Sequence, residues 1–224
     1  MNVYEAIASR KSVREFLPTP VPAETIRRVL SAAARAPSGG NVQPWHIDVV
    51  GGEALDRFKS IMRERLSLPP ESAEPRDYDI YPKQLVSPYR DRRFKVGEDM
   101  YAKLGIPRED KAARLRWLAN NYRFFGAPLA LFCSVDRRMG PPQWSDLGMY
   151  LQSVMLLLRE EGLDSCPQEC WSHYPRTVAE FIGLPGELML FCGMSIGYRN
   201  PDSAVNRLVA ERAPLEEFAR FHGL

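Results

Sequence analysis

Three cationic side chains and one hydroxyl group lie within five residues near the N-terminus, where residues 10–14 read RKSVR. Guanidinium, ammonium and hydroxyl groups donate hydrogen bonds to anionic oxygens, and a cluster of them suits a phosphate dianion. Taken alone, the segment is more typical of a solvated basic turn that follows a helix. Its interpretation therefore depends on the segments that accompany it.

A second informative segment is the run of small and polar residues at 36–45, APSGGNVQPW. Small residues let backbone N–H groups approach a flat ligand closely. Two further blocks follow downstream, SCPQE at 165–169 and GMSIGY at 193–198, the latter ahead of Asn206 and Arg207. Each block alone resembles any polar connection, so the order of all four carries the information.

Several common chemistries lack their sequence patterns. The three histidines lie far apart, and the spacing of Cys166 and Cys170 is wider than that of a redox pair. The chain contains no nucleophile elbow, Walker loop or dinucleotide fingerprint. A catalytic metal, acyl transfer, phosphoryl transfer and Rossmann-type NAD binding therefore lose support. A site rich in cations and poor in acid–base residues suits chemistry that a cofactor such as a flavin performs.

Length and composition predict one globular enzyme domain. The chain has 224 residues, of which 45% are hydrophobic and 26% charged, with a formal net charge of +2. This balance argues against general binding to nucleic acid or to an anionic membrane. The sequence has neither an apolar run of membrane-spanning length nor a signal-peptide core, and its four cysteines suggest no disulfide framework. We therefore expect a cytoplasmic protein.

Helical and strand patterns alternate along the chain, which predicts an α+β or α/β fold. Asn2 and Glu5 form a capping box ahead of a first helix that ends near Ser9. The other predicted helices begin at Pro22, cover residues 55–62, and span Lys111–Phe124, Trp144–Glu161 and Leu215–Phe221; the predicted strands are Trp45–Val50, Leu129–Val135 and Leu188–Ile196.

The stretch from about residue 67 to 108 differs from the rest, because six prolines interrupt a sequence dense in charge and tyrosine. These prolines exclude one long helix. Two interpretations stay open, a solvated excursion and a lid over an active site. The aromatic residues argue against plain disorder.

The ordered set of blocks resembles the FMN-dependent nitroreductase superfamily, from Val3 to the C-terminus. The segments at 88–90, 124–128 and 140–144 are similar to the nitrobenzoate and nitroaromatic reductase subgroup. The resemblance implies an α+β nitroreductase-like fold with a central mixed, mainly antiparallel sheet flanked by helices. It also implies an intertwined homodimer with FMN at the subunit interface and the helices at 144–161 packed across the two-fold axis.

The resemblance also implies roles for particular residues, with the chemistry on FMN, no catalytic side chain and no metal. Arg10, Lys11, Ser12 and Arg207 would hold the phosphate and ribityl chain, and Arg14 would lie toward the pyrimidine edge. Pro37, Ser38, Gly39 and Asn41 would come from the other subunit. Pro167, Gln168 and Glu169 would line the ring, with the backbone of Glu169 near N5.

The implied activity is hydride transfer from NADH or NADPH through FMN to a nitroaromatic or quinone acceptor, with ping-pong kinetics. Phe124 or tyrosines of the insert would stack on the acceptor, and Arg90 and Arg93 would bind its polar group. Alternatives stay open: reductive dehalogenation or flavin fragmentation on the same fold, a flavin storage module, and a structural protein. No motif identifies the natural acceptor or distinguishes NADH from NADPH.

Overall fold

The computed structural model describes residues 1–223, and the strands in this part of the chain form one sheet. Its order is β1-β2-β4-β3, with β1 at His46–Gly51, β2 at Leu129–Asp136, β3 at Asp164–Gln168 and β4 at Leu188–Gly197. All three strand pairs are antiparallel, and a parallel bridge joins Ser12 to Ser165 at the free edge of β3. The α+β class and the mainly antiparallel sheet are confirmed.

The position of each strand in the sheet explains its sequence. The central strands β2 and β4 are buried almost throughout, and both appear as continuous apolar runs. The edge strand β3 reads DSCPQ and has few apolar residues, so its pattern does not predict a strand. Pro167 is tolerated there because the N–H that proline lacks would face away from β4.

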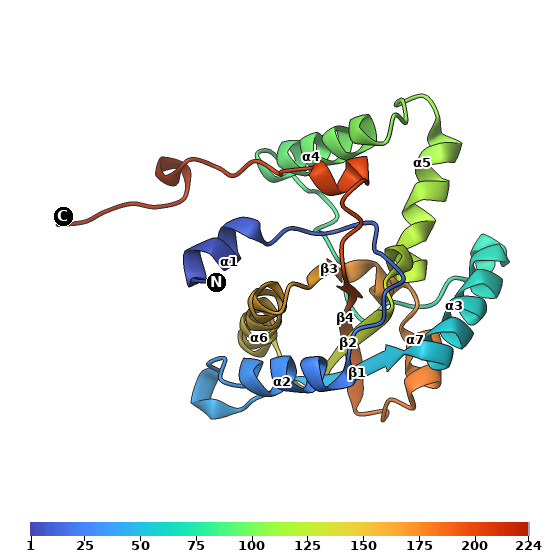
Figure 1. Ribbon diagram of the computed structural model, residues 1–224, viewed down its shortest axis with the longest axis horizontal. Coiled ribbons are helices and arrows are strands. Elements are labelled where there is room, and N and C mark those ends of the chain that lie inside the picture. Colours follow the sequence, from blue (N-terminus) through green and yellow to red (C-terminus); the bar gives the residue numbers. More distant parts are fainter. Residues whose placement is uncertain (224) are drawn as a thin grey trace.

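Helices cover both faces of the sheet (Figure 1). On one face, α2 (Ala23–Ala33) and α6 (Pro141–Glu160) bury an apolar stripe that includes Ile26, Leu147 and Val154. On the other, α3 (Gly52–Ser67) and α7 (Pro175–Ile182) pack around an aromatic core that includes Phe58 and Trp171. The short helix α1 (Val3–Ser9) carries the predicted capping box and lies against α6, where the N-terminal amine is 2.6 Å from a Glu160 carboxylate oxygen.

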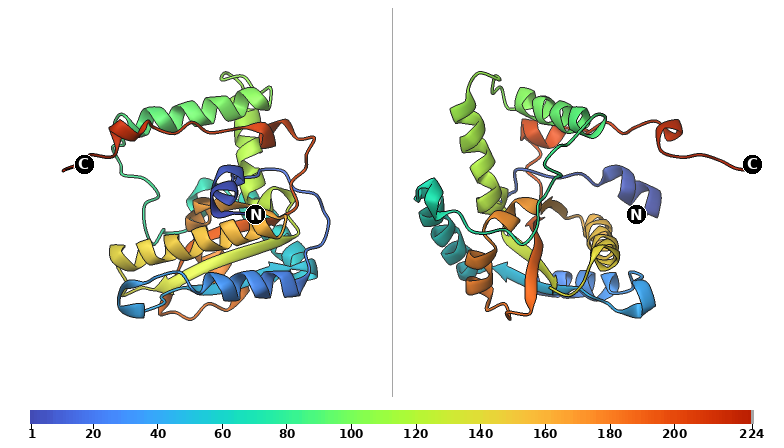
Figure 2. Two further views of the ribbon diagram at one scale, coloured as in Figure 1. Left: turned by 60° about the vertical axis from the view of Figure 1, so that its left-hand side comes forward. Right: turned by 180° about the vertical axis from the view of Figure 1, so that it is seen from behind.

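The insert at 67–108 contains a long helix, α4 (Tyr89–Lys103), that the sequence pattern left unassigned. The prolines of the insert lie on either side of it, and residues 89–106 contain none. Together with α5 (Lys111–Leu118), α4 stands away from the sheet above the N-terminal segment (Figure 2). The part of the chain that the structure describes has no helix that is both long and apolar enough to cross a bilayer.

Three predicted element boundaries are wrong. The helix expected at Lys111–Phe124 ends at Leu118 and continues as an irregular 3₁₀ turn, η3 (Ala119–Gly126), in which Phe124 and Phe125 have φ of 52° and 53°. Helix α6 begins at Pro141 rather than Trp144, because proline is well tolerated in a first helical turn. The terminal helix is a single 3₁₀ turn, Leu215–Glu217. Besides β3 and α4, the sequence pattern also missed α7.

Candidate functional site

A cavity of about 810 Å³ opens between the end of α1, the N-terminal segment, α6 and the C-terminal segment. Its wall carries the cations Arg10, Lys11, Arg14, Arg159, Arg199 and Arg212 together with the Ser12 hydroxyl, and within residues 1–223 no acidic residue lines it. Such a wall attracts an anion strongly. The structure thus brings four of the sequence-predicted residues, those of the RKSVR segment, to one cavity.

The N-terminal segment is held as an extra strand along the free edge of β3. The Val13 amide donates to the Ser165 carbonyl over 3.0 Å, and the Val13 side chain is fully buried in the aromatic core. Further along, the Phe16 amide donates to Phe125 over 3.1 Å. This pairing alternates side-chain directions, so Val13 turns inward while Ser12 and Arg14 remain at the cavity.

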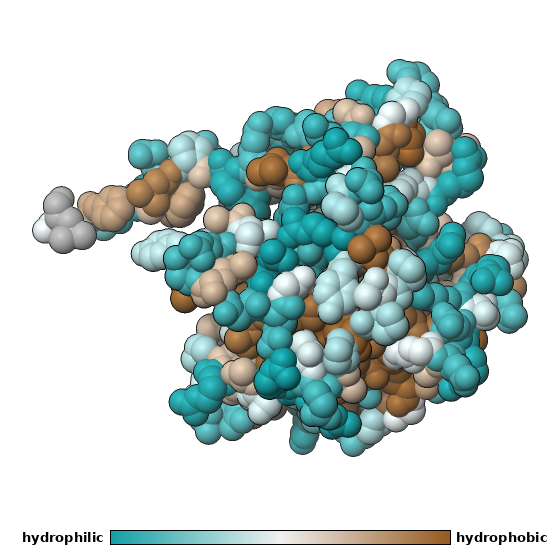
Figure 3. All heavy atoms as spheres, viewed as in Figure 1, coloured by the Kyte–Doolittle hydropathy of each residue, from teal (hydrophilic) through white to brown (hydrophobic). Residues whose placement is uncertain are grey.

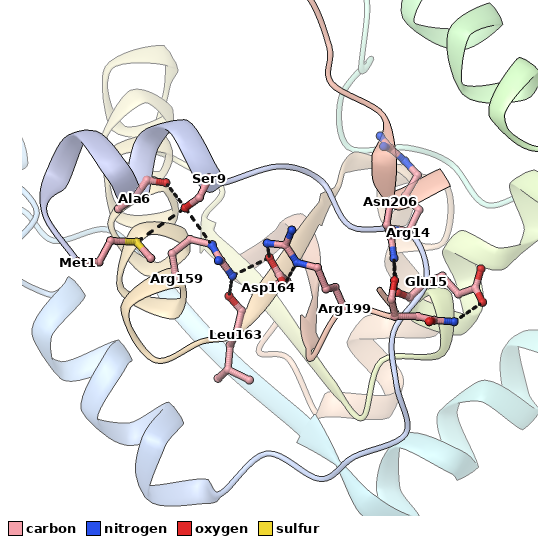
Figure 4. Close-up of polar contacts among 11 residues, drawn as sticks. Met1, Ala6, Ser9, Arg14, Glu15, Arg159, Leu163, Asp164, Arg199 and Asn206 are labelled. Carbon is pink, nitrogen blue, oxygen red and sulfur yellow. Dashed lines mark hydrogen bonds and ion pairs between the residues drawn. The ribbon is translucent and has the colours of Figure 1, made fainter. Parts of the chain in front are cut away.

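Asn206 fixes the far end of the same segment (Figure 4). Its Oδ1 accepts from the Arg14 amide over 2.8 Å, and its Nδ2 donates to the carbonyls of Glu15 and Asn200 over 2.7 and 3.0 Å. Asn206 is buried, whereas Arg207 is exposed and donates to the Asp202 carbonyl over 2.9 Å. Sequence reasoning selected Arg207 and missed the structural role of its neighbour.

Arg212, not Arg207, lines the cavity beside the predicted cations. Burial, together with the nearby Arg212 guanidinium, lowers the pKa of Arg10 from its ordinary value. Burial and the nearby Arg199 lower the pKa of Lys11 in the same way. In both cases burial is the larger cause, and the neighbouring guanidinium group adds to it.

A buried carboxylate organises two of the cations. Asp164 is 2% exposed and accepts two hydrogen bonds from Arg199, over 2.6 and 2.7 Å, and one from Arg159 over 2.9 Å. Arg159 also donates to the Ser9 hydroxyl and to the Leu163 carbonyl, which ties α1, α6 and β3 together (Figure 4). The network fixes both guanidinium groups at the cavity wall.

Beyond the paired segment, the edge of β3 presents the Glu169 backbone amide, which has no hydrogen-bond partner among residues 1–223. Backbone groups alternate direction along a strand, so the Glu169 N–H points to the same edge as the Ser165 carbonyl that accepts from Val13. Glu169 also begins the 3₁₀ turn η4 (Glu169–His173), where the first amides have no partner within the turn. Pro167 and Glu169 are exposed, whereas the Gln168 side chain is buried.

The turn at Pro37–Asn41 does not join this cavity within one chain. It forms the short turn η1 (Gly39–Asn41), with φ of 56° at Gly40 and 58° at Asn41. The Gly39 amide lies 3.3 Å from an Asp146 carboxylate oxygen in the second turn of α6. Pro37, Gly39 and Asn41 are exposed, and Ser38 is partly so.

Of the side chains expected to contact the acceptor, Phe124 needs correction, whereas Arg90 and Arg93 are exposed and stay predictions. Phe124 is fully buried and stacks on Trp171 with ring centroids 4.6 Å apart, so its ring cannot contact a substrate. Arg90 pairs with Asp91 of its own helix, and Arg93 lies over the Tyr81 ring at 4.4 Å.

Comparison with known proteins agrees with this geometry. The family model described as "Nitroreductase family" matches residues 7–198. The chain belongs to the nitroreductase family. Its sequence is 36% identical over 217 residues to a 4-nitrobenzoate reductase from Pseudomonas putida, covering 97% of this chain and 94% of that protein.

Solved nitroreductases share the whole fold. The structure described as FMN and NADPH-dependent nitroreductase NfnB from Sphigopyxis sp. strain HMH has a TM-score of 0.97 and 47% identity, with all of both chains covered. The FMN-dependent nitroreductase NfnB from Mycobacterium smegmatis, in complex with NADPH, has a TM-score of 0.92 and 33% identity, covering 98% of this chain and 97% of that one.

Proposed function

We propose that this nitroreductase-family protein is an NAD(P)H-dependent FMN oxidoreductase that reduces small nitroaromatic or quinone acceptors. Bound FMN would supply the redox chemistry, by accepting a hydride from NADH or NADPH and passing electrons to the acceptor in a ping-pong cycle. The names of the relatives support this assignment, since they describe reductases of nitro compounds and structures dependent on FMN and NADPH.

The observation that carries the proposal is the cation-lined cavity beside the free edge of β3. Its guanidinium, ammonium and hydroxyl groups match a phosphate dianion at one end. The exposed backbone edge that continues past Ser165 offers a planar ligand a hydrogen-bond donor at the other. The cavity itself has no residue of β3 in its wall, so in this proposal the phosphate end would lie in the cavity and the ring would lie along the neighbouring edge.

We assign the site residues accordingly. Arg10, Lys11, Ser12 and Arg212 would hold the phosphate end, and Arg14 would lie toward the ring. Arg207 is left out of the residues assigned to the phosphate, because it does not line the cavity. Pro167 and the Glu169 backbone would border the ring, and the Gln168 side chain would act indirectly. The part of the chain that the structure describes has no cluster of potential metal ligands, and the proposal needs no metal.

We further propose a homodimer, in which Pro37, Ser38, Gly39 and Asn41 would complete the site of the partner copy. Helix α6 leaves Ser145, Gly148 and Met149 exposed on one side, at helical spacing. The segment after β4 extends away from the body of the molecule and exposes apolar side chains, among them Val209 and Phe218 (Figures 1 and 3). A second copy that covers both surfaces would bury them.

The insert at 67–108 is proposed to act as a lid on a single nitroreductase-like domain. Val96 of α4 lines the cavity together with the cations. Residues 74–78 fasten the insert to the body, where Glu74 accepts from the Arg176 amide and Asp77 pairs with Arg137. A cytoplasmic location would supply the NAD(P)H, and it agrees with cysteines that are free throughout the described residues.

The test is the visible absorption spectrum of the purified protein, recorded before and after anaerobic addition of NADH or NADPH. We expect a flavin spectrum that bleaches and then returns when a nitroaromatic is added. A yellow protein that does not bleach would indicate flavin storage instead. A colourless protein that takes up no FMN would contradict the proposal altogether.

A further inference from the structure

Gln168 uses its whole side-chain amide inside the protein. Its Nε2 donates to the Asn121 carbonyl over 2.7 Å and lies 3.3 Å from Asn121 Oδ1, while its Oε1 accepts from the Ser195 hydroxyl over 2.7 Å. Gln168 is 2% exposed and Ser195 is fully buried. The amide therefore joins three elements, η3, β3 and β4, at the end of the edge strand.

The position needs a donor and an acceptor together. A carboxylate at Gln168 would lose the donor that the Asn121 carbonyl requires, and an aliphatic side chain would supply neither group. Buried hydrogen bonds add little net stability compared with a well-packed apolar replacement, but they fix direction. This network is thus better suited to orienting the strand end than to stabilising the fold.

The turn that follows Gln168 is fixed from a second side. Trp171 is fully buried against β4, and a side-chain carbon at Gly193 would lie 2.4 Å from Trp171 Cδ1. Gly193 pairs directly with Gln168 in the sheet. The free Glu169 amide is therefore held between two rigid contacts, the Gln168 side chain and the Trp171 ring.

We propose that Gln168 is a positioning residue that sets the direction of the Glu169 N–H toward the cofactor ring. The inference rests on the proposed function, since it requires FMN at the free edge of β3. Gln168 itself would touch no reacting atom. Its effect would reach the cofactor through the backbone of the next residue and would shift the balance between the oxidised and the reduced ring.

The test compares Gln168→Leu and Ser195→Ala with Ser134→Ala. Ser134 is a buried serine of β2 whose hydroxyl has no partner in the described residues, so it controls for the loss of a buried hydroxyl group. The readouts are amide hydrogen exchange across residues 168–171 in the FMN-free protein, FMN affinity, and the two-electron potential of the loaded protein.

We expect Gln168→Leu to speed local exchange and to change the equilibrium constant for FMN reduction about tenfold, which is about 30 mV for a two-electron couple. Ser195→Ala should act in the same direction by about threefold, since it removes one of the hydrogen bonds. FMN affinity should stay within about threefold in both variants, because the phosphate cations are untouched. Ser134→Ala should change none of the three readouts.

Wild-type potential and exchange in both Gln168→Leu and Ser195→Ala would overturn the inference. If Gln168→Leu fails to fold, Ser195→Ala decides alone, because it keeps the glutamine and removes only a hydroxyl group. Failure of the proposed function is a different result, since the wild-type protein would then bind no FMN. Faster local exchange with an unchanged potential would leave a purely structural role for Gln168 and would also overturn the inference.

Discussion

Single side chains decide how strongly the cavity attracts an anion. Six cations line its wall, and Asp164 directly neutralises charge only on Arg159 and Arg199. Arg10 and Lys11 are left with lowered pKa values, caused first by burial and next by a neighbouring arginine. A bound dianion would offset the repulsion between these neighbouring cations, which favours the binding of phosphate.

Arg212→Ala should weaken FMN binding by roughly tenfold to a hundredfold, the usual effect of losing a hydrogen-bonded charge. Arg207→Ala is the matched control, because Arg207 and Arg212 are both exposed and carry the same charge, but Arg207 does not line the cavity. Titration of the FMN-free variants with FMN, followed by flavin fluorescence, measures both. A larger loss from Arg207→Ala would restore the assignment made from the sequence.

FMN affinity should fall at alkaline pH because of Lys11. In the free protein its pKa is lowered below the ordinary 10.5 by burial and Arg199, and only the ammonium form binds phosphate strongly. Between about pH 7, where the phosphate is a dianion, and the lowered pKa of Lys11 the affinity is flat. Above that pKa, binding must first protonate Lys11, so the affinity declines as pH rises. Lys11→Arg keeps its charge and should flatten the profile, and an equal decline in that variant would exclude Lys11.

The residue-level site was only partly predictable. The RKSVR segment was found because its charges are contiguous in the sequence. Arg212 was missed because it lies about two hundred residues away in an irregular segment, where nothing in the local sequence distinguishes a site arginine from a solvated one. Asn206 was passed over in favour of the charged Arg207, although a buried asparagine can satisfy several backbone groups at once.

At the scale of elements, a short strap fastens the insert to the body. Within it, Glu74 accepts from the Arg176 and Thr177 amides, over 2.7 and 3.2 Å, and from the Thr177 hydroxyl. Arg76 lies 3.2 Å from His173 Nδ1, and Asp77 pairs with Arg137 over 2.6 Å. Tyr78 donates to the Phe191 carbonyl of β4. The strap covers residues 74–78, and the chain then runs on to α4.

Glu74→Ala should lower the free energy of unfolding by about 1–3 kcal/mol, because α7 has no side-chain cap of its own and Glu74 satisfies its first amides. Glu71→Ala, an exposed carboxylate three residues earlier, should change it by less than about 0.5 kcal/mol. Denaturant unfolding measures both values. Limited proteolysis between residues 79 and 88 should also accelerate in Glu74→Ala alone; equal stability of the two variants would show that the strap does not hold α7.

Elements with strong periodicity were predictable, and those shaped by tertiary contacts were not. The apolar stripes of α2 and α6 and the runs of β2 and β4 are visible in the sequence because their burial is regular. The edge strand β3 has an irregular pattern because its partners on one side are Ser12 and Val13, far away in the sequence. Helix α4 was not predicted, because the prolines on both sides of it make the whole insert look irregular in the sequence.

At the scale of the whole molecule, a substitution on the exposed side of α6 distinguishes a monomer from a dimer. Among residues 1–223, no atom lies within 4 Å of the place that a side-chain carbon would take at Gly148. In a monomer, Gly148→Leu should therefore stabilise α6 by about 0.5–1 kcal/mol, from helix propensity alone. In a dimer that packs at this glycine, the same change should dissociate the subunits and release FMN.

We expect the second outcome, measured by sedimentation and by flavin content. Ser60→Leu on the exposed side of α3 is the control for a new surface leucine, and it should leave both readings unchanged. A stabilised Gly148→Leu protein that keeps its flavin would refute the shared site.

The cavity is completed late in the synthesis of the protein. Its wall joins Arg10 to Arg212, and the segment that holds Arg14 is pinned by Asn206. The ribosome therefore releases the first cations long before their partners exist, and all four sheet strands are complete by residue 197, ahead of the site. A nascent chain that stops before Arg212 would have every strand of the fold and an open, unfinished wall. If FMN binds in this cavity as we propose, its binding would require chains that were translated through their C-terminal segment.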